Sequence, residues 1–262
     1  MHASRQPPVV LIIAGNDPCG GAGLAADLQA VTALGGHPAP VVTALTVQDT
    51  VNAWYMEAVS AELVVRQAQA VLTDLPVAAI KLGLLGSAAI GHALAQMLAV
   101  HARIPLVLDP VLAAGGGAAL AEPALVNIYL EELLPLAGIA TPNAAESRRL
   151  APQGTDAKAR AVALLARGCR HVLIKGADAN TVDVENVLFS HDGSQQPYTW
   201  PRLPGEYHGS GCTLASAIAA LLARGDSVRD AVAEAQRYTW ETLNHGWRLG
   251  KGQLIPNRQS RS

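Results

Sequence analysis

The chain has 262 residues, of which 50% are hydrophobic and 15% charged, and its formal net charge is −2. This apolar content supports a sizeable core and excludes disorder over most of the length. Without a basic surplus to neutralise phosphates, the composition argues against nucleic acid as the main partner.

Cysteine usage and hydropathy indicate where such a protein works. Cys19, Cys169 and Cys212 form no CxxC pair, which favours reduced thiols in the cytoplasm. The first apolar run, at 9–14, turns polar too soon for a secretion signal. No uninterrupted apolar stretch reaches the roughly 18 residues of a membrane span. We therefore expect a soluble cytoplasmic protein with no membrane partner.

Short apolar runs alternate along the chain with longer, alanine-rich stretches of helical character. In chain order we expect strand 9–14, helix 24–34, strand 41–45, helix 61–73, strand 78–82, helix 88–100, strand 106–109, helix 124–134, strand 138–141, helix 156–167, strand 171–175, strand 186–189, and helices 211–224 and 227–244.

This alternation predicts a three-layer α/β/α fold with a mostly parallel central sheet. Several of the strands are almost entirely apolar, as expected when helices cover both faces. No linker interrupts the pattern, so we expect one domain over 1–262 with frayed tails at 1–7 and 252–262. Ligands of such sheets bind at the carboxyl ends of the strands, where the residues of interest are found.

The loop AGNDPCGGAG at 14–23 joins the first strand to a helix. Its glycines allow close backbone approach, and the following helix start favours an anion or a polar ligand. The loop has neither the GxxxxGK[ST] nor the GxGxxG spacing. A tight turn without a ligand is the alternative interpretation.

The segment HGSGCT at 208–213 opens a long apolar helix, so several of its N–H groups can converge on one anion. In the first turn, we expect the helix dipole to lower the pKa of the Cys212 thiol. The resulting thiolate would take a proton from a hydroxyl or attack an electrophile. The alternative is a cysteine packed as a small hydrophobe.

Polar residues also follow three other strands. Asn143 and Glu146 lie one helical turn apart, and the carboxylate suits Mg²⁺, although a plain helix cap is the alternative. Asp109 can contact metal or substrate and Lys175 can contact phosphates, unless both are solvated strand ends. Together with the anion hole and its base, these groups describe a kinase.

Seven motifs occur in order between residues 8 and 245, namely AGNDPCGGAGLAAD, VTALTVQDT, KLGLLGS, LDPV, TPNAAE, VLIKGAD and HGSGCTLASAIAA. In these motifs the chain resembles the hydroxymethylpyrimidine/phosphomethylpyrimidine kinases of thiamin biosynthesis, which belong to the ribokinase-like superfamily. The resemblance implies phosphorylation of hydroxymethylpyrimidine with ATP and Mg²⁺, followed in bifunctional members by phosphorylation of the monophosphate. It also implies a homodimer.

The same resemblance gives individual residues a role. The general base would be Cys212, the anion hole would be Gly209, Ser210 and Gly211, and the residue bordering the transferred phosphoryl group would be Asp109. ATP would meet Lys175 and Asn143, and Mg²⁺ would be held by Glu146, through water. The pyrimidine would contact Gly15, Asp17, Gln48, Leu84 and His208, with Gln48 hydrogen-bonded to the ring edge.

The chain departs from the family pattern at several places. The family usually has serine at the position of Asn16, asparagine at that of Asp49 and often methionine at that of Leu84. The loop AAGGG at 113–117 lacks the lysine or serine often found there, and KGAD at 175–178 replaces KGGH. Because the loop 113–117 lacks these polar groups, we expect it to bind the phosphorylated intermediate less well. The resemblance therefore implies the second phosphorylation less strongly than the first.

Three other functions fit parts of the pattern. A pyridoxal or pyridoxine kinase also acts on a hydroxymethyl-bearing nitrogen heterocycle, although Gln48 favours an aminopyrimidine edge. A sugar kinase would usually have aspartate in place of Cys212. A non-catalytic pyrimidine sensor would be expected to have lost Cys212, Glu146 or Lys175, yet all three are present.

Overall fold

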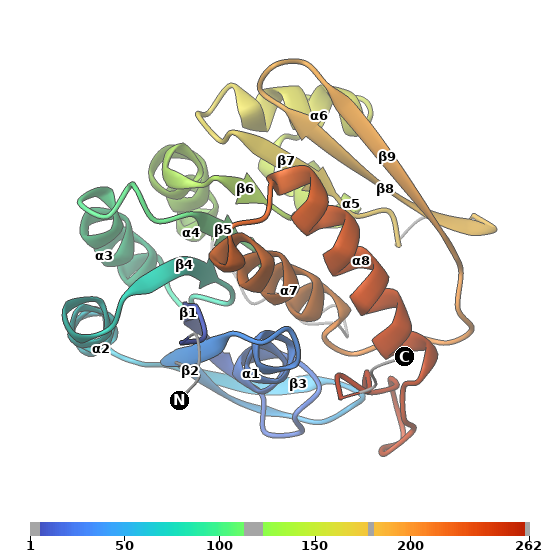
Figure 1. The fold of residues 1–262 in the computed structure, drawn as a ribbon, viewed down its shortest axis with the longest axis horizontal. Helices are drawn as coiled ribbons and strands as arrows, with labels where there is room; N and C mark the ends of the chain where they lie inside the picture. The colour runs from blue at the N-terminus through green and yellow to red at the C-terminus, as the bar shows by residue number, and fades with distance from the viewer. Residues whose placement is uncertain (1–5, 113–122, 178–180, 260–262) are drawn as a thin grey trace, which may run out of the picture.

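The computed structural model describes residues 6–112, 123–177 and 181–259. Within them, one nine-stranded sheet has the order β3-β2-β1-β4-β5-β6-β7-β8-β9 (Figure 1). The strands from β2 to β7 in this order are parallel, and β3, β8 and β9 are antiparallel to their neighbours. The strands are β1 (Val9–Asn16), β2 (His37–Gln48), β3 (Ala53–Ala58), β4 (Val77–Leu82), β5 (Leu106–Leu108), β6 (Ile139–Ala140), β7 (His171–Ile174), β8 (Asp183–Ser190) and β9 (Gln195–Pro201).

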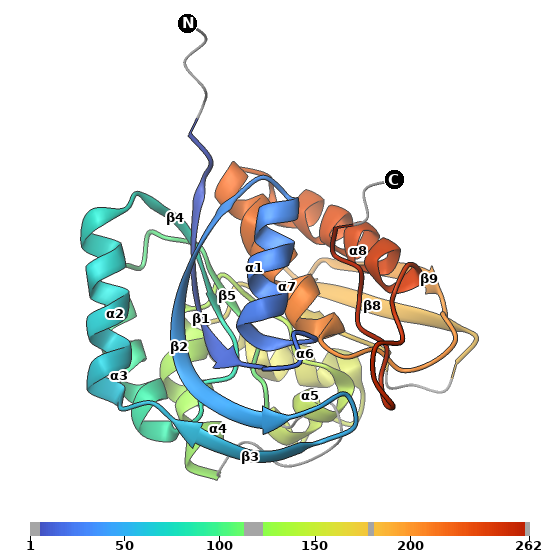
Figure 2. The ribbon, with the colours of Figure 1, turned by 90° about the horizontal axis from the view of Figure 1, so that it is seen from below.

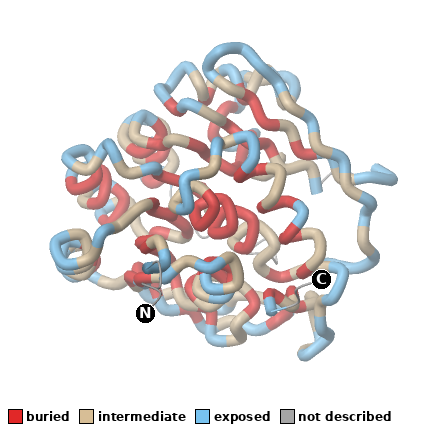
Figure 3. Tube along the Cα trace, in the orientation of Figure 1, coloured by how far each residue is buried: buried red, intermediate tan, exposed pale blue. Residues whose placement is uncertain are grey.

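Helices cover both faces of the sheet, which confirms the three-layer α/β/α fold (Figure 2). Because successive side chains of a strand point to opposite faces, Val10 and Ile12 of β1 pack in one core while Leu11 and Ile13 pack in the other. The first face carries α1 (Gly23–Ala33), α7 (Ser210–Arg224) and α8 (Val228–Asn244). The second carries α2 (Ala61–Asp74), α3 (Ala88–Ala99), α4 (Pro123–Ile128), α5 (Ala144–Leu150) and α6 (Ala157–Leu165). Most of α7 is buried (Figure 3).

The predicted strands and helices are all present, with boundaries shifted by a few residues. The largest differences are β2, which extends well beyond 41–45 at both ends, and the expected helix 124–134. The latter is α4 followed by a π-helical turn (Tyr129–Leu133) and a 3₁₀ turn (Leu134–Leu136). No strand was predicted at β3 or β9, which are the two edges of the sheet. Both leave much of their length exposed, so neither has the apolar run of a central strand.

The expected fraying of 252–262 is wrong for the residues from 252 to 259. Here a C-terminal strap, residues 247–258, turns back on itself, with the Trp247 N–H donating to the Ile255 carbonyl at 2.8 Å. The strap also pairs with 206–208, where the His208 N–H donates to the Leu254 carbonyl at 2.8 Å. The Arg258 side chain is only 1% exposed. Backbone hydrogen bonds and the buried Arg258 thus hold a segment that was expected to be frayed.

Two further expectations concern the segments outside the described residues and the absence of a membrane span. Residues 1–5, 260–262 and the glycine-rich loop 113–117 lie outside the described residues. In the described part of the chain, no helix combines the length and the apolar character that crossing a bilayer requires.

Candidate active site

A cavity of about 830 Å³ opens at the carboxyl ends of β1, β4, β5, β6 and β7. This is the edge of a parallel sheet at which ligands bind. Its wall includes every residue to which the family resemblance gave a role, namely Gly15, Asp17, Gln48, Leu84, Asp109, Asn143, Glu146, Lys175, His208, Gly209, Ser210, Gly211 and Cys212. Their gathering at one site is as expected, whereas their individual roles remain predictions.

The helix α7 begins at this cavity with a conformation that requires glycine. Gly209 precedes the helix with a φ of 77°, and a Cβ at this position would lie 2.0 Å from the Gly21 carbonyl oxygen. Thr213 closes the turn, because its N–H and hydroxyl donate to the Gly209 carbonyl at 2.9 and 2.8 Å. The first N–H groups of a helix have no intrahelical acceptor, so those at 209–212 are available to an anion.

Cys212 lies half-buried in this first turn. Burial raises the pKa of its thiol to about 11, since the thiolate loses hydration and the positive charge of Lys81 compensates only in part. The expectation that the helix dipole lowers this pKa below its ordinary value is therefore wrong. A thiolate of high pKa is scarce at neutral pH, but it is a strong base once it forms.

Asp109 and Lys175 form an ion pair beside the same helix start. Lys175 Nζ donates to Asp109 Oδ1 at 3.0 Å, and the Thr141 hydroxyl donates to the same oxygen at 3.0 Å. A Cβ on Gly211 would lie 3.0 Å from Lys175 Nζ, so the absence of a side chain there leaves space for the ammonium group. Burial alone would lower the pKa of Lys175, but Asp109 and Glu146 together raise it. Lys175 thus stays charged next to the N-terminus of α7.

Asn143 and Glu146 form a reciprocal cap at the start of α5. The Asn143 N–H donates to Glu146 Oε2 at 2.7 Å, and the Glu146 N–H donates to Asn143 Oδ1 at 2.7 Å. The simpler alternative, a helix cap, therefore describes the protein without ligands. The Glu146 carboxylate is nevertheless on the cavity wall near the charge of Lys175. A carboxylate oxygen in a cavity that also holds a lysine and the N–H groups of a helix start fits Mg²⁺ accompanied by phosphate.

The opposite part of the cavity is built from the first loop, β2 and His208. A Cβ on Gly15 would lie 2.8 Å from Leu84 Cδ2, so these two residues touch and form an apolar wall. Asp17 Oδ2 lies 2.9 Å from His208 Nε2. Burial alone would raise the pKa of Asp17, but hydrogen bonds from His208, Gln48 and neighbouring groups hold it well below its usual range. Asp17 therefore carries a fixed negative charge.

A second buried ion pair was not predicted from the sequence. Lys81 of β4 and Asp27 of α1 are fully buried, and Lys81 Nζ donates to the two Asp27 carboxylate oxygens at 2.9 and 2.8 Å. The signal was present, because a lysine interrupts an otherwise apolar strand and an aspartate interrupts an alanine-rich helix. Lys81 belongs to the KLGLLGS motif and lies on the cavity wall.

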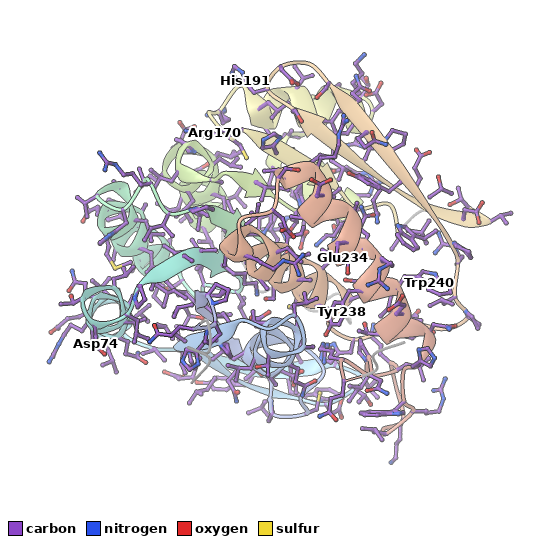
Figure 4. The ribbon with its side chains drawn as sticks, in the orientation of Figure 1. Asp74, Arg170, His191, Glu234, Tyr238 and Trp240 are labelled. Atoms are coloured by element: carbon purple, nitrogen blue, oxygen red, sulfur yellow. The ribbon has the colours of Figure 1, made fainter. Side chains whose placement is uncertain are left out.

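Arg258 is a further missed residue, because it lies in the segment expected to be frayed. Its Nε donates to the Thr213 hydroxyl at 2.8 Å, and its Nη2 donates to the Gly21 carbonyl. Tyr238, which projects from α8 in Figure 4, donates its hydroxyl to the Arg258 carbonyl at 2.9 Å. Arg258 thus fastens the first glycine loop to the start of α7.

Trp200 and Trp240 stack with ring centroids 6.2 Å apart. Both also lie on the cavity wall. The Trp240 indole N–H donates to the Pro201 carbonyl at 2.9 Å, which fixes β9 against α8.

Comparison with known proteins identifies relatives over nearly the whole chain. A sequence model of the phosphomethylpyrimidine kinase family matches residues 17–257. A hydroxymethylpyrimidine/phosphomethylpyrimidine kinase of Mycobacterium bovis is 40% identical over 252 residues, covering 94% of this chain and 92% of that protein. The thiamine biosynthesis bifunctional protein ThiED of Geobacter sulfurreducens is 41% identical over 249 residues, or 93% of this chain. The chain spans only 50% of that bifunctional relative.

Two solved structures are similar in fold over most of this chain. A phosphomethylpyrimidine kinase from Clostridium difficile has a TM-score of 0.77 at 30% identity, covering 89% of this chain and 98% of that one. The pyridoxal kinase of Staphylococcus aureus, solved with AMP-PCP and pyridoxal, has a TM-score of 0.87 at 26% identity, covering 97% and 94%. Both likenesses confirm the ribokinase-like fold. Since the family model matches most of the residues and a named relative reaches 40% identity, the chain belongs to the phosphomethylpyrimidine kinase family.

Proposed function

We propose that this protein transfers the γ-phosphoryl group of ATP to the hydroxyl of 4-amino-5-hydroxymethyl-2-methylpyrimidine, and then phosphorylates the monophosphate, as a step in making thiamin. One observation carries the proposal. A single cavity joins the N-terminus of α7 to the Lys175–Asp109 pair and to the apolar wall of Gly15 and Leu84. The names of the relatives from Mycobacterium bovis and Geobacter sulfurreducens support this substrate class.

The chemistry follows from what the start of α7 offers. The substrate hydroxyl oxygen attacks the γ-phosphorus, a new P–O bond forms, the bond to the β–γ bridging oxygen breaks, and ADP leaves. The thiolate form of Cys212 accepts the hydroxyl proton and becomes a thiol. The N–H groups of Gly209, Ser210 and Gly211 donate to the phosphoryl oxygens, whose negative charge they stabilise in the transition state.

The ATP end of the cavity is assigned to Lys175, Asn143 and Glu146. The pyridoxal kinase of Staphylococcus aureus binds the ATP analogue AMP-PCP, which supports ATP as the donor. Glu146 would hold Mg²⁺ through water, and the ion when bound would neutralise phosphate charge. Lys175 is kept in place by Asp109, so the ammonium group does not have to be ordered when ATP arrives.

The pyrimidine end is assigned to Gly15, Leu84 and Gln48, with Asp17 and His208 beside them. The apolar wall of Gly15 and Leu84 suits the face of a flat ring. The Gln48 amide has both a donor and an acceptor, so it can pair with a ring nitrogen and its neighbouring amino group.

A pyridoxal kinase is the second candidate, favoured by the higher TM-score of the Staphylococcus aureus enzyme. The deciding experiment measures ADP release with Mg-ATP and, separately, hydroxymethylpyrimidine, its monophosphate, pyridoxal and ribose. Turnover of both pyrimidines supports the bifunctional kinase, and turnover of the first alone supports a single-step kinase. A preference for pyridoxal contradicts the proposal, and silence with all four substrates favours the sensor.

We also propose that the protein is a homodimer. Exposed apolar side chains gather on the hairpin of β2 and β3, where Leu45, Val47, Trp54 and Tyr55 are 54%, 57%, 65% and 59% exposed. Patches of this kind mark interaction surfaces, and β3 is an edge strand whose backbone groups can pair with another chain. A cytoplasmic location and the absence of a nucleic-acid partner stay predictions from the sequence.

A further inference from the structure

The buried pair of Lys81 and Asp27 is connected to the helix that carries Cys212. Ser216 lies one turn after Cys212 on α7, and its hydroxyl donates to Asp27 Oδ1 at 2.7 Å. The same carboxylate accepts both hydrogen bonds from Lys81 Nζ. The pair therefore ties β4, α1 and α7 together at the level of the first turns of α7.

Lys81 has one N–H group left for the cavity. Its ammonium has three donors, of which two go to Asp27, and no other described residue accepts the third. A Cβ on Gly83 would lie 2.6 Å from Lys81 Nζ, so glycine at this position leaves room for the ammonium group. Lys81 and Cys212 line the same cavity. A buried cation with a donor to spare beside a thiol is suited to stabilising a thiolate.

We propose that Lys81 is a positioning residue for the phosphoryl transfer, because its ammonium group stabilises Cys212 as a thiolate while Asp27 limits the strength of that effect. This inference rests on the proposed role of Cys212 as the base. It also explains why both charges are present in the core, where a pair of apolar side chains would pack at no electrostatic cost.

The electrostatics of the site agree with this arrangement. Burial alone would lower the pKa of Lys81, but Asp27, Cys212 and Asp109 raise it, so the ammonium stays charged. The charged groups that face Cys212 come from five segments and are Lys81, Asp27, Asp109, Lys175 and Arg258. Lys81 opposes the effect of burial on the Cys212 pKa most strongly, whereas Asp27 and Asp109 raise that pKa further.

The test measures the pH dependence of Cys212 alkylation by iodoacetamide in the full chain. Trypsin places Cys212 in the peptide 203–224, apart from Cys19 and Cys169, so mass spectrometry reads each thiol separately. Lys81→Met should slow alkylation of Cys212 at pH 8 by about tenfold, since removing a nearby opposite charge raises a buried thiol's pKa by about one unit or more. Asp27→Asn should have the opposite effect and accelerate it.

Both variants disturb the same ion pair, so a merely structural role would change the Cys212 alkylation rate in the same direction in each. Rate changes in opposite directions therefore distinguish the proposed role from a structural one. Alkylation rates that change in the same direction in both variants, or that change in neither, would overturn the proposal. If Lys81→Met does not fold, the double variant Lys81→Met/Asp27→Leu removes both charges and keeps the volume. Its Cys212 should react more slowly than that of Asp27→Asn, and equal or faster alkylation would overturn the proposal.

Activity separates this inference from the proposed function. The pH profile of kcat should move in the same direction as the alkylation profile in each variant. If alkylation moves while the kcat profile does not, Cys212 is not the base, and the proposed function fails at that residue. If alkylation does not move, the role of Lys81 fails whatever the activity.

Discussion

Cys212 lies where a helix start, a buried lysine and two carboxylates meet, and each of them changes the free energy of its thiolate. The helix start attracts the negative charge, whereas burial opposes it and is the larger effect. Phosphates bound at the same N–H groups add further negative charge. In the proposed mechanism, these surroundings make the Cys212 thiolate a strong proton acceptor.

Replacing Cys212 tests the role directly. We expect Cys212→Ala to lower kcat at least about 100-fold, the usual contribution of a positioned base, while the Kd for the pyrimidine changes little. Cys169→Ala is the matched control, because that thiol is buried outside the cavity. Steady-state kinetics and calorimetry check both variants, and near-normal turnover of Cys212→Ala would refute the assignment.

The raised thiol pKa predicts a pH dependence. Far below a pKa of about 11, the thiolate fraction rises about tenfold for each pH unit, so kcat/KM should increase across pH 7 to 9. A carboxylate is already ionised in this range, so Cys212→Asp should have a flatter profile. A wild-type rate that is constant across this range would contradict the prediction.

Among the elements, α7 carries the most of the proposed function, because its first turn presents N–H groups to the cavity and its next turns pack in the core. Gly209→Ala should destabilise the fold by about 1–3 kcal/mol and lower kcat, since the new Cβ meets the Gly21 carbonyl. Gly225→Ala is the matched control at the other end of α7. Gly225 has a φ of 100° and no heavy atom within 4 Å of the added Cβ, so it should cost about 1 kcal/mol without loss of kcat.

Chemical denaturation and steady-state kinetics of the two glycine variants check this difference. Equal losses of activity in Gly209→Ala and Gly225→Ala would show that the helix needs only its stability, and that its N-terminal geometry has no special part in catalysis.

The elements also show which parts of the fold could be predicted from the sequence. Central strands such as β1 have uninterrupted apolar runs, and the helices start at caps such as Ser60 and Ser227. The edges β3 and β9 expose much of their length, so they lack that signal. The glycine-rich loops, Asp109 and Lys175 were found because they follow strands, whereas Gln48, Leu84 and His208 came only from the family resemblance. Lys81, Asp27 and Arg258 were missed because their partners are distant in sequence, up to 237 residues for Arg258 and Gly21.

For the molecule as a whole, the acid limit of stability depends on Asp17. Its pKa is depressed in the folded state, so it contributes stability above its unfolded pKa of about 4, and this contribution is lost as the pH falls below that value. We therefore expect the free energy of unfolding to fall more steeply from about pH 5 to about pH 3 in the wild type than in Asp17→Asn. Urea denaturation at several pH values measures both slopes, and equal slopes would contradict the prediction.

The proposed dimer is also a property of the whole molecule. Trp54→Lys places a charge in the exposed apolar surface of the β2–β3 hairpin and should convert a dimer to a monomer. Light scattering after size-exclusion chromatography measures the mass. Val100→Lys is the control, since that residue is 80% exposed at the end of α3, outside the hairpin. A monomeric wild type would contradict the proposal.

The position of Arg258 has a consequence for how the cavity can lose its shape. Its guanidinium group joins the Gly21 carbonyl to the Thr213 hydroxyl, although Gly21 is 237 residues away in the sequence. Local opening of the strap alone would therefore uncouple the glycine loop from the start of α7, while the sheet and its helices stay folded.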